Sequence, residues 1–310
     1  MRLDDQRRSD NVEDRRGQRG GGGGGGMGGG IISLIGSRFG IGGLIVVGLL
    51  FFLAPAPVKQ MLLGLIGGGG GAVTSEPGKA GAPADQTGDF MSAVLGSTED
   101  FWKQEFARGA MAHYGFQSRE YAPTRLVLFD GQTGTRCGTG TAAIGPFYCP
   151  ADLQVYIDTS FFKTMRDKLG ASGDFAEAYV IAHEVGHHVQ TITGISETIQ
   201  RMKARGNERE SNALQVRMEL QADCFAGAWG KYFSEQRTAA GQPRLEAGDF
   251  EEAMTAANAI GDDTLQRQSR GYVQPDSFQH GTSEQRKRWF QLGFTTGDPA
   301  ACDTLSTNNL

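Results

Sequence analysis

Two histidines and a glutamate in one short stretch, His183, Glu184 and His187, have the residue types and the spacing that hold a catalytic metal ion. An α-helix turns about 100° per residue, so His183 and His187 lie on one face and can bind the same ion through their imidazoles. Glu184 lies beside that face, where its carboxylate reaches a water on the metal without being a ligand. This HExxH arrangement predicts a Zn2+ site with Glu184 as general base.

A catalytic zinc site usually has a third protein ligand, and a second pair of acidic residues is the candidate. Glu219 and Asp223 are also four residues apart, and apolar residues such as Leu220 and Phe225 surround them. Carboxylates on an apolar helix need a partner. One of the two can bind the metal, and the other can accept the free ring N–H of a ligand histidine. The spacing alone leaves these two roles open.

The remaining candidates for the site are three further histidines and a tyrosine outside the two motifs' ligand positions. His280 or Tyr272 could stabilise the oxyanion of a tetrahedral intermediate, although a histidine before a helix can also be purely structural. His188 points about 100° away from the ligand face, so we expect it to be structural. His113 is expected to be unrelated to the site.

The elements that must position these residues follow from hydrophobic periodicity. Residues 125–130 and 153–158 are strand-like, and Cys137 and Cys149 bracket a Gly-rich hairpin or loop. The motifs fall on two helices, and further helices are expected on both sides of them. The expected helices are residues 98–111, 176–193, 211–233, 250–260 and 283–293. A small β-containing part followed by a helical part argues for an α+β fold.

Three separated motifs carry a resemblance to a known family: FYCPADLQVYID at 147–158, HEVGHHVQ at 183–190 and MELQADCFAG at 218–227. Together they are similar to the membrane-anchored bacterial family described as "putative neutral zinc metallopeptidase", over about residues 89–306. The resemblance implies a zincin-like, gluzincin-type domain. It also implies that His183, His187 and Glu219 are the zinc ligands, that Glu184 is the base, and that Asp223 orients a ligand histidine.

The first third of the chain has a different composition. Residues 1–38 are rich in charge and glycine, and we expect a disordered tail. Residues 39–58 carry no charge and would span about 30 Å as a helix, which predicts a transmembrane signal-anchor. Residues 59–88, rich in Gly, Ala and Pro, are expected to form a flexible tether to the metallopeptidase domain at 89–306.

Arginine is concentrated before the predicted transmembrane segment. Between the end of that segment and the folded part, the basic residues are Lys59 and Lys79 alone. The positive-inside rule therefore predicts a single-pass protein of the inner (cytoplasmic) membrane. Its N-terminus would lie in the cytoplasm and its catalytic domain would be periplasmic or otherwise extracytoplasmic.

An oxidising compartment would allow disulfide bonds between the four cysteines of the chain. Four cysteines allow three pairings. We expect Cys137 to pair with Cys149 across a short loop and Cys224 to pair with Cys302, which would brace the helix that carries Glu219 and Asp223.

These observations predict a membrane-anchored zinc metalloendopeptidase that hydrolyses peptide bonds with a zinc-activated water. Its partners would be a protein or peptide substrate and the membrane. A net charge of −5 argues against nucleic-acid binding. Two alternatives stay open: a non-enzymatic envelope protein that uses zinc structurally or binds a partner, and a zinc amidase that acts on cell-wall amides.

Overall fold

The computed structural model describes residues 1–18, 78–81, 83 and 85–310 of the 310-residue chain. This described part confirms the α+β class: it has eight α-helices, one five-stranded mixed sheet and one two-stranded hairpin. The strands are β1 (Val12–Asp14), β2 (Lys79–Ala80), β3 (Arg125–Phe129), β4 (Gln132–Thr135), β5 (Gly138–Thr141), β6 (Phe147–Cys149) and β7 (Gln154–Asp158). The helices are α3 (Gln86–Arg108), α4 (Ser160–Leu169), α5 (Asp174–Ile192), α6 (Ile195–Lys203), α7 (Glu208–Glu235), α8 (Asp249–Ala259), α9 (Asp262–Arg270) and α10 (Ser283–Thr296).

The sheet has the strand order β2-β1-β3-β7-β6, in which β1, β3 and β7 are parallel and both edge strands are antiparallel to their neighbours. Because side chains alternate along a strand, the two faces bury different sets of residues. The face toward the helices contributes five residues to the main core: Val12, Leu126, Leu128, Val155 and Ile157. The opposite face forms a smaller cluster with Phe147 packed against it: Val127, Phe129, Cys149 and Tyr156.

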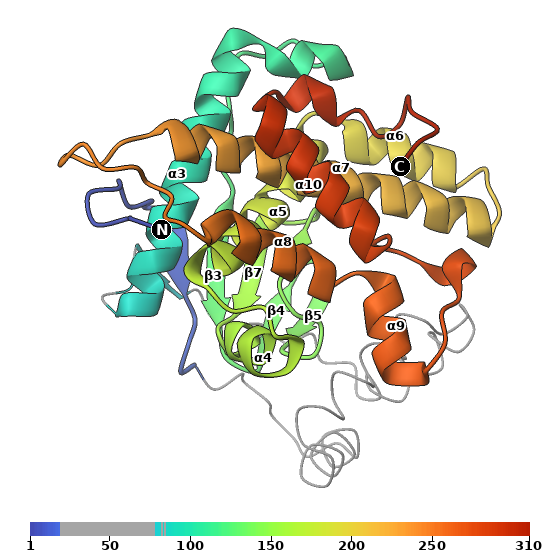
Figure 1. Ribbon diagram of the computed structural model, residues 1–310, viewed down its shortest axis with the longest axis horizontal. Coiled ribbons are helices and arrows are strands. Elements are labelled where there is room, and N and C mark those ends of the chain that lie inside the picture. Colours follow the sequence, from blue (N-terminus) through green and yellow to red (C-terminus); the bar gives the residue numbers. More distant parts are fainter. Residues whose placement is uncertain (19–77, 82, 84) are drawn as a thin grey trace, which may run out of the picture.

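Helix α5 packs against β6, β7 and α3, while α7 packs on α5 and α10 packs on α7 (Figure 1). The approach of α10 to α7 depends on glycine, because a Cβ at Gly293 would collide with the backbone carbonyl of Cys224. Likewise, a Cβ at Gly227 would collide with the carbonyl of Phe290. The last helix can therefore deliver a side chain to the helix pair that carries the motifs.

Both predicted disulfide bonds are confirmed. Cys137 and Cys149 join the β4–β5 hairpin region to β6, with their Cα atoms 5.9 Å apart. Cys224 and Cys302 join α7 to the C-terminal segment, with their Cα atoms 5.6 Å apart. The second bond follows Asp223 directly, so the C-terminal segment braces the part of α7 that carries the predicted site.

The structure differs from the predicted disordered tail at residues 1–18. These residues are ordered and provide β1, which lies between β2 and β3, and Val12 is only 1% exposed. The prediction from composition was wrong because charged residues of this segment form ion pairs with residues far along the chain. Arg7, for example, pairs with Glu99. Part of the expected tether also differs, since β2 and the first turn of α3 fall within residues 59–88.

The predicted transmembrane segment at 39–58 lies outside the described residues. Among the helices that the structure describes, none is both long enough and apolar enough to cross a membrane.

Candidate metal centre

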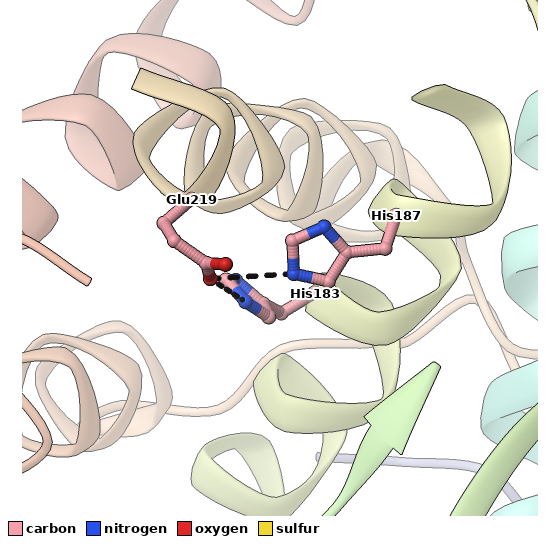
Figure 2. Close-up of side chains that lie close together, drawn as sticks. All are labelled: His183, His187 and Glu219. Atoms are coloured by element: carbon pink, nitrogen blue, oxygen red, sulfur yellow. Dashed lines mark hydrogen bonds and ion pairs between the residues drawn. The ribbon is translucent and has the colours of Figure 1, made fainter. Parts of the chain in front are cut away.

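Helices α5 and α7 cross closely at the predicted motifs. A Cβ on Gly186 would lie 3.2 Å from the Cα and the carbonyl oxygen of Ala222, so the small residue allows the two helices to approach. Asn207 and Glu210 fix the start of α7 through a capping box. The close crossing brings His183 and His187 of α5 opposite Glu219 of α7 (Figure 2).

Three donor atoms converge between the helices. The Nε2 atoms of His183 and His187 lie 3.2 Å and 3.3 Å from one oxygen of Glu219, and all three donors lie within 4.8 Å of one another. In a tetrahedral zinc site with bonds of about 2.0–2.1 Å, donor atoms are about 3.3 Å apart. The spacing and the chemistry of this donor set therefore fit a zinc ion, with both histidines binding through Nε2.

A buried carboxylate supports His183. The Nδ1–H of His183 donates to Asp223 at 2.8 Å, and Asp223 is fully buried. Arg286 of α10 donates to both oxygens of Asp223, each at 2.8 Å, and the Tyr179 hydroxyl donates to it at 2.6 Å. Asp223 is thus held by three partners and is positioned to fix the ring orientation of His183.

The charges of this cluster shift its pKa values in opposite directions. Although burial opposes ionisation, the positive charges of Arg286 and His183 lower the pKa of Asp223 to about 2. Burial also disfavours a charged imidazole, but the Glu219 carboxylate raises the pKa of His187 to about 9. The pKa of Glu219 is held well below its usual range because the charge of His187 outweighs the effect of burial. A ligand pocket with this charge balance favours a cation.

His187 has a neutral support instead. Its Nδ1–H donates to the Gln190 side-chain oxygen at 2.9 Å. The Gln190 amide donates in turn to the Met218 carbonyl at 2.7 Å and to Gln221 at 3.0 Å. Gln221 donates to the Cys302 carbonyl, so this network runs from the metal centre to the second disulfide bond.

The other oxygen of Glu219 accepts a hydrogen bond from Gln215 at 2.7 Å, which fixes the carboxylate orientation.

Glu184 is 7% exposed and lies near enough for its charge to raise the pKa of His187. Within the described residues, no hydrogen-bond partner occupies the Glu184 carboxylate. Its oxygens are therefore not engaged by another described side chain, which is compatible with the predicted base.

His280 lies on the loop before α10, next to the Glu219 turn of α7. Its charge helps to lower the pKa of Glu219, and the adjacent Gly281 approaches Val216 and Leu220. The His280 side chain is 44% exposed and donates from Nδ1 to Asp262 at 3.1 Å. The alternative candidate, Tyr272, is 61% exposed at the end of α9.

His188 is structural, as expected. It hydrogen-bonds the carbonyl of Ala122 at 2.7 Å, and burial lowers its pKa to about 4.

Several supporting residues were not identified from the sequence. Two of them, Tyr179 and Gln215, lie one turn before His183 and Glu219 on the same helix faces. That spacing could have revealed them. Arg286 had no such signal, because its partner Asp223 is 63 residues away.

Comparison with known proteins agrees with this geometry. The sequence model of the family described as "Putative neutral zinc metallopeptidase" matches residues 1–305. The "Uncharacterized protein YpfJ" of Escherichia coli strain K12 is 47% identical over 309 residues, which is 98% of this chain and 99% of that protein. The "Uncharacterized protein Rv2575" of Mycobacterium tuberculosis strain H37Rv is 43% identical over 195 residues, 61% of this chain and 65% of that protein. No solved structure matches the chain significantly.

Proposed function

The chain belongs to the family described as "putative neutral zinc metallopeptidase", and from this premise we propose that it is a zinc-dependent peptidase that hydrolyses peptide bonds. The observation that carries the proposal is the convergence of the donor atoms of His183, His187 and Glu219 beside the unpartnered carboxylate of Glu184.

A structural zinc site accounts for this arrangement less well. Structural sites are closed by four protein ligands, mostly cysteines and histidines. Within the described residues, the cluster contains three donors, and all four cysteines are held in disulfide bonds. A three-ligand site keeps a position for water or substrate, which is the arrangement of catalytic zinc.

Each residue of the site has a distinct role in this proposal. His183, His187 and Glu219 hold the zinc ion, and the hydrogen bond to Asp223 fixes the Nδ1-protonated tautomer of His183. Zinc, when bound, would polarise the substrate carbonyl and acidify a water molecule. Glu184 accepts the proton of the attacking water and passes it to the leaving amine.

His280 stabilises the negative charge on the carbonyl oxygen of the substrate by donating from Nε2. Because Nδ1 donates to Asp262, this role requires a proton on both ring nitrogens. Partial burial opposes the charged ring, but the hydrogen bond to Asp262 raises the pKa of His280 and favours the doubly protonated form. Asp262 also accepts the backbone N–H groups of Gln279 and His280, each at 2.6 Å, so it fixes the loop as well as the ring.

The proposal is tested by comparing zinc content and casein cleavage of the full-length protein and of Glu184→Gln. The variant should keep its zinc, because the three ligands remain, but should lose at least about 100-fold in kcat, because the base is absent. Chelator should abolish the wild-type activity, and added zinc should restore it.

The matched control is Glu197→Gln, since Glu197 is 72% exposed on α6 and pairs with Arg201. It should keep both zinc and activity. Full activity of Glu184→Gln would overturn the assigned mechanism. Loss of zinc from that variant would instead make Glu184 a ligand, and absence of cleavage by the zinc-loaded wild type would refute the peptidase proposal.

A further inference from the structure

The buried carboxylate of Glu99 on α3 has its partners in the first residues of the chain. Glu99 is 2% exposed and accepts hydrogen bonds from Arg7 at 2.7 Å, Ser9 at 2.6 Å and Asn11 at 2.7 Å. A buried carboxylate without partners is strongly unfavourable. Among the described residues, the side chains that hydrogen-bond this charge of helix α3 all lie within residues 7–11.

At Glu13 the roles are exchanged: the N-terminal segment supplies the buried carboxylate, and residues later in the chain supply hydrogen-bond donors. Glu13 is 4% exposed and accepts from the backbone N–H of Gly78 at 2.8 Å and from Arg125 at 3.2 Å. Arg15 adds a third hydrogen bond to Glu13 and lies over the ring of Tyr156, with its guanidinium carbon 5.8 Å from the ring centre. The two parts thus neutralise each other's buried charges.

The backbone pairing is equally specific. Strand β1 pairs in parallel with β3, with Val12 opposite Leu126, and β2 closes its other side. Without residues 1–18, β3 would present an open edge of unpaired backbone groups next to the main core. The β3 edge and the Glu99 face of α3 together form a docking surface, and residues 7–15 are its occupant.

We propose that residues 1–18 are an integral part of the metallopeptidase domain and that they lie in the same compartment as residues 78–310. A strand can pair only with a strand on the same side of a membrane. Under this proposal, residues 18 and 78 lie on the same side of any membrane that the protein contacts. A single crossing at 39–58 would separate β1 from β3, so the proposal replaces the single-pass topology expected from the sequence.

Labelling of single cysteines in the full-length protein tests the compartment. Asp10 before β1 and Gln104 on α3 are both exposed, and the native cysteines are paired and carry no free thiol. In intact cells, a membrane-impermeant maleimide should label the same fraction of Asp10→Cys and of Gln104→Cys, and permeabilisation should change both equally. Labelling of one position before permeabilisation and of the other only afterwards would overturn the proposal.

A cross-link tests the docking itself. Asp14 and Lys79 are direct partners in the β1–β2 pairing. The double variant Asp14→Cys/Lys79→Cys should form an intramolecular disulfide in the full-length protein on mild oxidation, as judged by peptide mapping. The matched control Asp10→Cys/Lys79→Cys, whose first cysteine precedes the pairing, should cross-link much less. Equal cross-linking of the two variants, or none in either, would refute the docking even if the two parts share a compartment.

Discussion

His183 donates its free ring N–H to a buried carboxylate, whereas His187 donates its own to a side-chain amide. The carboxylate needs a counter-ion, and Arg286 supplies one from the last helix of the chain. The amide needs none, because Gln190 is satisfied by the Met218 carbonyl and by Gln221. The two histidines of the candidate metal centre are thus supported differently: the charged support of His183 depends on an arginine from a distant helix, whereas the neutral support of His187 is satisfied by the neighbouring helix.

The largest expected effect comes from removing the counter-ion. Arg286→Met would leave Asp223 buried beside Tyr179 and His183 without the guanidinium that bonds both of its oxygens, and should destabilise the protein by about 3–5 kcal/mol. Urea unfolding of the zinc-free protein measures this loss.

Two further variants sharpen that result. Arg288→Met alters an exposed arginine of the same helix, which bonds Asn309, and should have little effect on stability. The double variant Arg286→Met/Asp223→Leu removes both charges and should be more stable than Arg286→Met alone. A single variant as stable as the wild type would show that Asp223 does not depend on Arg286.

Next in size is the effect of neutralising the charged support while keeping its shape. Asp223→Asn should still bind zinc but with an affinity about 10–100-fold lower, because the amide places no negative charge behind His183. Glu219→Ala should lose zinc outright. Titration against a competing chelator measures both, and the reverse pattern would exchange the roles of Glu219 and Asp223.

The pH dependence of zinc stabilisation follows from the raised pKa of His187. Without zinc, this protonated histidine stabilises the folded state below its ordinary pKa of 6.5, and the stabilisation is lost as the pH rises through about 9. Zinc needs the neutral ring, so the gap in Tm between the zinc-loaded and zinc-free protein should widen from pH 6.5 to 9. The gain is up to about 1.4 kcal/mol per pH unit for each displaced proton. A constant gap would count against histidine ligation.

The smallest effect is expected at the neutral support. Gln190→Ala removes one hydrogen bond from His187 but no charge, so zinc affinity should fall by no more than about 10-fold. The control is Gln200→Ala on the exposed side of α6, which should bind zinc normally. If Gln190→Ala weakened zinc binding as much as Asp223→Asn does, the difference between the two supports would not be electrostatic.

Local periodicity explains which features could be predicted from the sequence. The candidate ligands His183 and His187 follow from spacing along one helix, and the pair Glu219 and Asp223 follows from spacing along another, although only the family resemblance assigned Glu219 to the metal. The α+β order of elements follows from hydrophobic pattern. The supports Tyr179 and Gln215 share that spacing and were within reach of the same argument. All of these relations are contained within one or two elements.

The remaining features depend on partners that no local pattern reveals. From the sequence, Arg286 resembles an ordinary charged residue of an amphipathic helix. Its contact with Asp223 is visible only in the folded structure. Arg7 reads as part of a solvated tail, although its partner Glu99 lies 92 residues further on. Charge content predicts disorder only when the charges lack fixed partners, and this information resides in the tertiary structure.

The position of β1 in the sheet also has a consequence for the order of folding. The ribosome releases β1 well before β3, with which it pairs, and the contact of Glu13 with Arg125 spans 112 residues. Closing so long a loop is entropically costly and slow compared with forming the helices. Strand β1 must therefore remain unpaired until β3 has been synthesised, and the middle of the sheet is completed only after a large part of the chain has emerged.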